Sequence, residues 1–176
     1  GGLVNASNVR VAGDRFNADI IAHVRNEFKV LIGEKTAENL KIALASVVSN
    51  RDRIEAIARG RDLVTGLPRE ITLTDQDIRN AMGHSIEEIV EAVKGVLEST
   101  PPEIVADIMQ RGIHLVGGGA LIRGLPEFLM ESLGVPVNVD PDPLTAVVRG
   151  TAIVLDDIGK YHEALLKSDD ELVPTE

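Results

Sequence analysis

Residues 114–126 read HLVGGGALIRGLP, an apolar segment that leads into three consecutive glycines and then into the start of an amphipathic segment. A strand, a glycine turn and a helix in this order bring backbone amides close to a ligand at the carboxyl end of the strand. Gly117, Gly118 and Gly119 have no Cβ, so a flat group can approach the backbone there. The stretch is neither a G-x-G-x-x-G fingerprint nor a Walker loop, since Ala120 follows the third glycine and no Lys-Ser or Lys-Thr pair comes after it. Alone, it is compatible both with a ligand loop and with a tight turn that packs a helix against a sheet.

The composition is that of one ordinary domain, or of two small lobes, with an aliphatic core. The chain has 176 residues, of which 44% are hydrophobic and only 2% aromatic, so the core must consist of Ile, Val, Leu and Ala. The formal net charge of −10 argues against a nucleic-acid surface, which needs clustered lysines and arginines. The absence of cysteine excludes disulfides and thiolate metal sites and suits a cytoplasmic protein.

Two features of the chain bear on its origin and on membranes. No apolar run approaches the roughly 20 residues that cross a bilayer. The chain begins with Gly1 and Gly2 and shows no signal peptide, from which we expect a fragment or a processed chain.

Alternation and helical spacing predict the elements of the first half. In chain order, we expect a strand or hairpin at 3–12, a helix from Asp14 to Phe28, a helix at 36–48, and a β-hairpin with strands at 54–59 and 69–73. Asp14 and Thr36 stand where a side-chain oxygen can accept from the free amides of a first turn, so we expect them to cap the two helices.

The second half alternates helices and short strands. Thr74 or Asp75 is expected to cap a long helix with an apolar side from Ile78 to Leu97, which the sequence STPPE then ends. Beyond it we expect a helix at 102–110, a strand at 113–116, a helix at 125–133, a strand at 135–139 and a helix at 144–158 with Asp142 as its cap. This order predicts an α/β C-terminal part with an inserted helix–hairpin–helix lobe.

Several stretches, in the right order, resemble one protein family. The sequence LVGGGALIRGLPEFLMESLGVPVNV resembles the adenosine motif of the actin superfamily, and the following DPLTAVVRGTAIVL narrows the resemblance to the MreB family of bacterial actin homologues. Upstream, VRVAGDRFNADIIAHVRNEFKVLIGEKTAENLK resembles the family's GGDxFD turn and the helix after its IGExTAE stretch. RGRDLVTGLPREITLT resembles the hairpin of its fourth subdomain. The resemblance runs from about residue 3 to residue 158.

The resemblance implies an actin-like (ribonuclease H-like) ATPase lobe of the α/β class with an inserted small α+β subdomain. Residues 1–30 and 99–158 would form the subdomain with the adenosine motif, the family's IIA. Residues 31–98 would form the inserted subdomain, its IIB, and residues 159–176 a flexible acidic tail.

In this family ATP lies in a cleft between two large lobes. The resemblance implies that Gly118, Gly119, Ala120 and Leu121 border the adenosine. It also implies that the tetrad Glu38, Asn39, Leu40 and Lys41 reaches the nucleoside from the facing subdomain.

The chemistry of Glu38 and Lys41 is compatible with that role. The two residues are three positions apart and share a helical face, with Leu40 turned differently. A carboxylate can accept from ribose hydroxyls, while a lysine stem can lie over an adenine and keep its ammonium in water. An ordinary surface ion pair would have the same spacing.

The family's phosphate-binding hairpins, its Mg²⁺-organising aspartates and its water-activating residues lie upstream of the stretches matched here, and nothing in this chain replaces them. Asp14 is the nearest acidic candidate, and a helix cap explains it better. We therefore expect a slow ATPase in the parent protein, with Mg²⁺ bound by its N-terminal half, and no catalytic residue in this chain. The four histidines lack ligand spacing, so no metal site is expected.

The family resemblance also implies a biological role. The parent would polymerise into ATP-dependent filaments beneath the membrane and guide the cell-wall synthesis machinery that sets cell shape. Its partners would be further copies of itself and that machinery, with no nucleic acid and no direct membrane contact by this chain. The alternatives are the ATPase lobe of an actin-superfamily sugar kinase or heat-shock-type chaperone, and a stable folding unit without activity of its own.

Overall fold

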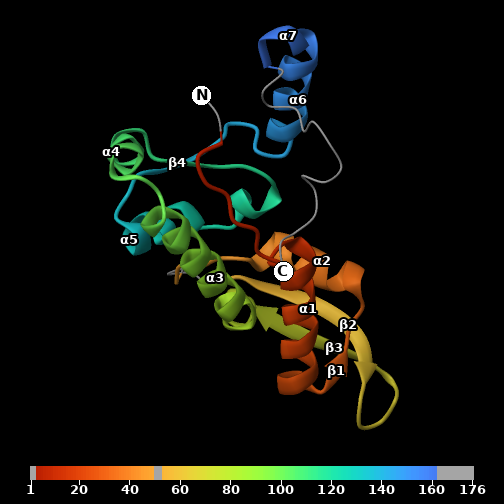
Figure 1. Cartoon of the computed structure of the whole chain (residues 1–176). Coiled ribbons are helices and arrows are strands. Elements are labelled where there is room, and N and C mark those ends of the chain that lie inside the picture. Colours follow the sequence, from red (N-terminus) through yellow and green to blue (C-terminus); the bar gives the residue numbers. More distant parts are fainter. Residues whose placement is uncertain (1–2, 50–52, 162–176) are drawn as a thin grey trace, which may run out of the picture.

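A three-stranded antiparallel sheet and a two-stranded parallel sheet lie in different parts of the structure (Figure 1). The structure is a computed structural model that describes residues 3–49 and 53–161. The larger sheet has the order β1-β2-β3 and consists of β1 (Val30–Leu31), β2 (Glu55–Asp62) and β3 (Pro68–Thr74). The smaller sheet pairs β4 (Ile113–Leu115) with β5 (Val137–Val139).

Helices cover one face of the larger sheet, whose other face is exposed. The described helices are α1 (Gly13–His23), α2 (Glu34–Leu44), α3 (Asp75–Glu98), α4 (Pro102–Arg111), α5 (Leu125–Leu133), α6 (Ala146–Asp156) and α7 (Ile158–Tyr161), with a π-helical turn η1 (Val24–Phe28) and a 3-10 turn η2 (Gly118–Leu121). Helix α1 packs against both α2 and α3, and α5 packs against α3 and β5.

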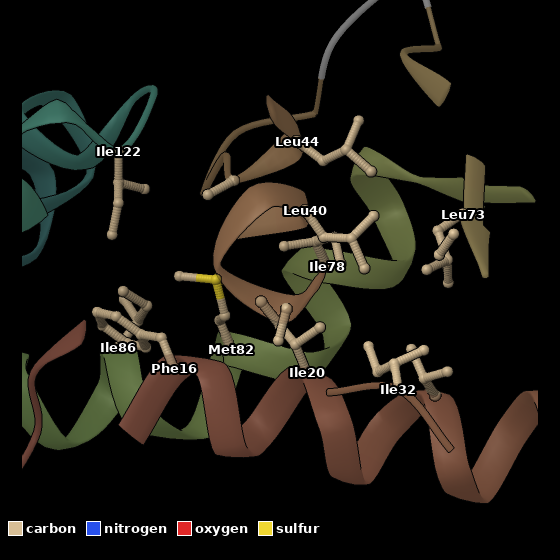
Figure 2. Packing of buried hydrophobic residues seen from close by; sticks show 14 of the residues in the cluster. Phe16, Ile20, Ile32, Leu40, Leu44, Leu73, Ile78, Met82, Ile86 and Ile122 are labelled. Atoms are coloured by element: carbon tan, nitrogen blue, oxygen red, sulfur yellow. The ribbon is translucent and has the colours of Figure 1, made fainter. Parts of the chain in front are cut away.

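The hydrophobic core lies where α1, α2 and α3 meet the larger sheet. Figure 2 shows Ile20 of α1, Leu40 of α2 and Ile78 of α3 close together, and all three side chains are buried. Leu73 of β3 is also fully buried, on the sheet side of this cluster. Each such aliphatic side chain contributes about 1.5–3 kcal/mol when it is removed from water. The aliphatic core that the composition predicts is confirmed.

The hairpin and the long helix after it follow the sequence closely. Strands β2 and β3 pair in an antiparallel register that sets Ala58 opposite Ile71. Thr74, and not Asp75, caps α3: its hydroxyl accepts from the amide of Asp77, while the Asp77 carboxylate accepts from the amide of Thr74. This reciprocal pair is a capping box, and it fixes the first turn of a helix whose apolar side faces the core.

The N-terminal predictions need correction. Residues 3–12 pair with no strand of the described chain; instead Asn5 donates to the hydroxyl of Ser99, at 2.6 Å. Asp14 does not cap α1, which begins one residue earlier with Ala12 as an N-cap that has no capping side chain. Asp14 lies in the first turn, where its charge complements the helix dipole.

The second helix is displaced from its predicted range. It begins at Glu34 after Gly33, so Thr36 is not its cap, and it ends at Leu44 and not at residue 48. At this end the carbonyls of Ala43 and Ala45 accept from the side chain of Arg123, which lies far along the chain. The two-residue strand β1 had no signal of its own in the sequence.

Helix α5 spans its predicted range and α4 extends one residue beyond its own, whereas β4, β5 and α6 are shorter than predicted. Helix α6 begins at Ala146, and the Asp142 carboxylate accepts from the Thr145 hydroxyl and does not cap the helix. Arg149 of α6 donates to Asp140, after β5, at 2.5 Å. Beyond this bond α6 stands clear of the sheets, with α7 at its end (Figure 1).

The predicted tail and the predicted subdomain limits have different outcomes. The first residues of the predicted tail are helical, since α7 extends to Tyr161, and the rest of that tail lies outside the described residues. The division at 1–30, 31–98 and 99–158 stays a prediction.

Candidate functional site

Glu38 and Lys41 of α2 form an ion pair that also engages α1. The Lys41 Nζ lies 2.7 Å from Glu38 Oε2 and donates as well to the carbonyl of Gly13, at 3.1 Å. The amide of Asn17 on α1 donates to the same oxygen of Glu38, at 2.8 Å. The pair is therefore part of a network that joins two helices and is more than an isolated surface contact.

This network holds Glu38 in its ionised form. The hydrogen bond from Lys41, and then the one from Asn17, lower the pKa of Glu38 against the opposing effect of desolvation. Both donors converge on Oε2. Within the described ranges no group of the chain donates to Oε1, so this oxygen is an open, charged acceptor.

The other two residues of the first tetrad point elsewhere. Leu40 is 3% exposed and belongs to the core. Asn39 lines a groove of about 350 Å³ between α2 and β2, together with Thr36 and Ala43. Asn39, Thr36 and Ala43 share a face of α2 that does not include Glu38 or Lys41. Any contact of Leu40 with a ligand would have to come from its backbone.

The glycine turn follows β4 and contains a residue with a positive φ angle. Gly117 has φ +79°, a conformation that glycine adopts without strain, and its amide donates to the carbonyl of Pro143 at 2.7 Å. A Cβ added to Gly119 would meet nothing within 4 Å, and one added to Gly118 would meet only the end of Leu144, at 3.7 Å. Packing within the described chain therefore does not demand glycine at 118 and 119, and the space above them is open.

The remaining two residues of the second tetrad differ in exposure. Ala120 is buried, whereas the side chain of Leu121 is 56% exposed. Leu121 can therefore contact a ligand through its side chain, while Ala120 supplies backbone.

Arg123 joins the glycine turn to α2. Its guanidinium donates to the carbonyls of Ala43 and Ala45, at 3.0 and 3.2 Å, and so completes the C-terminal end of α2. The amide of Val47 donates in turn to the carbonyl of Arg123, at 2.9 Å. Gly124 has φ +76°, and a Cβ there would lie 2.6 Å from Val48. The segments that directly follow the two tetrads thus lie side by side.

Sequence reasoning missed Asn17 and Arg123. Asn17 had a signal, because it is a polar residue beside Phe16 on the apolar stripe of α1. Arg123 had none, because its partners are main-chain carbonyls about 80 positions away.

The described part of the chain also lacks the features that a three-ligand metal site and a membrane-spanning helix require. Across residues 3–49 and 53–161, no three His, Asp or Glu side chains gather as metal ligands would. None of the helices in these ranges combines the length and the apolar character that crossing a bilayer requires.

The sequence of the chain matches a known protein family over most of its length. The sequence model of the MreB/Mbl protein family matches residues 1–163, which is most of the chain. The chain belongs to the MreB/Mbl family. Membership in this family does not favour the alternatives, a sugar-kinase lobe or a chaperone lobe.

Curated MreB and Mbl proteins resemble the chain over almost its whole length. The cell shape-determining protein Mbl of Bacillus subtilis (strain 168) is 45% identical over 160 residues, which cover 91% of this chain and 48% of that protein. The cell shape-determining protein MreB of Escherichia coli (strain K12) is also 45% identical over 160 residues, with 91% and 46% covered. The chain thus spans about half the length of the curated relatives it matches.

Solved structures share the fold. MreB5 of Spiroplasma citri bound to ADP superposes with a TM-score of 0.83 at 37% identity, covering 88% of this chain and 47% of that one. The same protein bound to AMPPNP gives a TM-score of 0.82. A MamK double helical filament, at 22% identity and a TM-score of 0.71, shares the fold alone. The fold is actin-like and α/β, as the resemblance implied.

Proposed function

We propose that this chain forms the adenosine side of an ATP-binding cleft in an MreB/Mbl-type protein. The observation that carries the proposal is an ionised Glu38 with one free oxygen, held on the same packed unit as an open glycine turn. MreB5 of Spiroplasma citri, which is 37% identical to this chain, binds ADP and AMPPNP, and this likeness supports a nucleotide as the ligand.

Each part of the proposed site has a chemical task. Glu38 Oε1 accepts from a ribose hydroxyl, and the Lys41 stem covers one face of the base. Gly118 and Gly119 let the flat base approach the backbone, and Leu121 contributes apolar contact. The backbone of residues 39–40 and of Ala120 borders the bound nucleoside.

Phosphate binding and hydrolysis are assigned to another part of the protein. The described chain gathers no acidic cluster for Mg²⁺, and charge stabilisation around the γ-phosphate and its metal is what hydrolysis requires. The proposed role of this chain is to hold the nucleoside end with low affinity. ATP hydrolysis, with Mg²⁺, belongs to a longer protein whose other half supplies those groups.

The proposed cellular role follows from family membership. Relatives that are 45% identical are cell shape-determining proteins. We propose that the parent polymerises on the cytoplasmic side of the membrane and guides the cell-wall synthesis machinery. Sedimentation of the longer protein with and without ATP tests polymerisation, and a protein that never pellets contradicts it.

Adenosine titration tests the nucleoside site itself. We expect adenosine to shift the amide NMR signals of residues 38–41 and 118–121 in this chain. Glu38→Gln keeps the shape but removes the charge of the acceptor, and should weaken binding about tenfold, since a hydrogen bond to a charged group contributes about 1.5–3 kcal/mol.

Glu34→Gln is the matched control. Glu34 lies in the first turn of the same helix and is exposed, so this variant makes the same change of charge outside the network. Equal weakening by the two variants, or shifts confined to other residues, contradicts the proposed site.

A further inference from the structure

Asn17 is a buried amide whose two ends have different surroundings. The residue is 5% exposed and lies on α1 beside Phe16, within the core-facing stripe. Its Nδ2 donates to Glu38 Oε2 at 2.8 Å. Its Oδ1 is buried and accepts no hydrogen bond from any described residue.

The carboxylate of Glu38 fixes which way this amide points. Turning the amide over would place Oδ1 against an ionised oxygen and remove a donor from it, which is unfavourable on both counts. Leaving Oδ1 buried without a partner is also unfavourable. An apolar side chain would avoid that penalty, so the bond to Glu38 is what the amide contributes at this position.

We propose that Asn17 is a positioning residue for nucleoside binding: its amide holds Glu38 through Oε2, so that Oε1 faces a ligand hydroxyl. This inference rests on the proposed function. Asn17 acts through Glu38 and does not touch the ligand. Lys41 shares the task, and its ammonium is itself held between Glu38 and the carbonyl of Gly13. The planar amide of Asn17, on a packed helix, adds a donor with a fixed direction.

Because residue 17 is an amide and not an acid, its hydrogen bond to Glu38 does not depend on pH. Aspartate has nearly the same shape as Asn17, but it would place a second carboxylate beside Glu38. Two carboxylates at hydrogen-bonding distance cannot both ionise freely, so they share a proton and the pKa of one rises. An amide donates to Glu38 at every pH.

The charged surroundings do not alter this expectation. Lys41 is the charged group that contacts Glu38. The other charged groups of the packed helices include Asp14 of α1 and Glu34 of α2, and Arg15, which pairs with Asp19 of α1 and with Glu88 of α3. An added carboxylate at position 17 would therefore enter an environment with one cation already shared.

The experiment measures adenosine affinity of the 176-residue chain by NMR from about pH 5 to about pH 8, the range above ordinary carboxyl pKa values. Adenosine is the probe because it carries no phosphate to titrate. For Asn17→Asp we expect wild-type affinity at the acid end, where the shared proton replaces the amide donor. We expect a fall of about three- to tenfold toward pH 8, as that proton leaves.

Asn26→Asp is the matched control. Asn26 is an exposed residue of η1, and the variant introduces the same charge outside the network. Wild type and Asn26→Asp should bind adenosine with an affinity that does not change with pH over this range. A purely structural role of Asn17 would alter the fold of the variant at all pH values and would not produce a slope.

A second readout needs no ligand. The side-chain carboxyl signal of Glu38 should titrate at a higher pH in Asn17→Asp than in wild type. Identical titration of Glu38 in the two proteins, or a flat affinity profile for Asn17→Asp, overturns the inference. Wild-type protein that binds no adenosine overturns the proposed function instead, and the Glu38 titration still decides whether Asn17 holds that carboxylate.

Discussion

Asp62, the last residue of β2, organises the tip of the β2–β3 hairpin through both of its carboxylate oxygens. Oδ1 accepts from the backbone amides of Val64 and Thr65, at 2.7 and 2.9 Å, and Oδ2 accepts from Arg69 at 3.0 Å. The two backbone amides, and then Arg69, lower the pKa of Asp62. The turn is thus specified by one ionised side chain.

This arrangement predicts how hairpin stability depends on pH. A lowered pKa in the folded state stabilises the protein above the ordinary aspartate pKa, and this contribution disappears as pH falls through the lowered value. Asp62→Asn should therefore lower the free energy of unfolding near neutral pH, and the deficit should shrink in acid. Urea unfolding of both proteins from about pH 7 to about pH 3 measures it.

Asp107→Asn provides the comparison, because Asp107 is an exposed aspartate on α4. A deficit for Asp62→Asn that is the same at every pH would contradict the role given to its charge. So would an equal, pH-dependent deficit for Asp107→Asn.

At the scale of elements, Arg123 stabilises the C-terminal end of α2. Without its guanidinium the carbonyls of Ala43 and Ala45 lose a charged donor. Arg123→Ala should lower the free energy of unfolding by about 1–2 kcal/mol and should speed amide exchange at Val47, whose partner is the Arg123 carbonyl. Arg111→Ala, at the exposed end of α4, should change neither quantity. Unchanged exchange at Val47 in Arg123→Ala would show that the side chain does not hold this segment.

The elements also differ in how far the sequence could predict them. Helix α3 and the β2–β3 hairpin carry their own signals, namely the Thr74 capping box and alternating apolar positions, and local signals survive in the fold. Residues 3–12 alternate as a strand does, yet a strand needs an edge to pair with, and no local pattern reports whether one exists. The end of α2 is stabilised by Arg123, which lies about 80 positions away.

The candidate site shows the same division. The spacing of Glu38 and Lys41 correctly predicts a shared helical face, because helical periodicity is local. That Asn17 completes their network, and that Asn39 faces a different groove, depends on how α1 and β2 pack against α2. Such packing is a property of the tertiary structure and leaves no short-range trace in the sequence.

At the scale of the whole molecule, α6 carries an uncovered apolar stripe. We define the stripe as Val147, Val148 and Leu155, which lie on one side of the helix and are 62–70% exposed. An exposed apolar stripe of this kind is typical of a surface that packs against another protein surface.

The stripe predicts concentration-dependent self-association of the 176-residue chain on its own. A Val147→Ser, Leu155→Ser double variant should associate at least about tenfold more weakly, because each buried methylene contributes about 0.8 kcal/mol. Analytical ultracentrifugation measures the change. Ile57→Ser, which removes a 61% exposed side chain from β2, should have little effect. Undiminished association of the double variant would contradict the role of the stripe.

The bonds of Arg123 have one more consequence, for motion. The guanidinium, the Val47 amide and the contact of Gly124 with Val48 fasten the end of α2 to the segment after the glycine turn. In the proposed cleft, the two nucleoside-facing segments are therefore linked where each of them ends. A shift of α2 along its axis would be passed directly to the residues that follow the glycine turn.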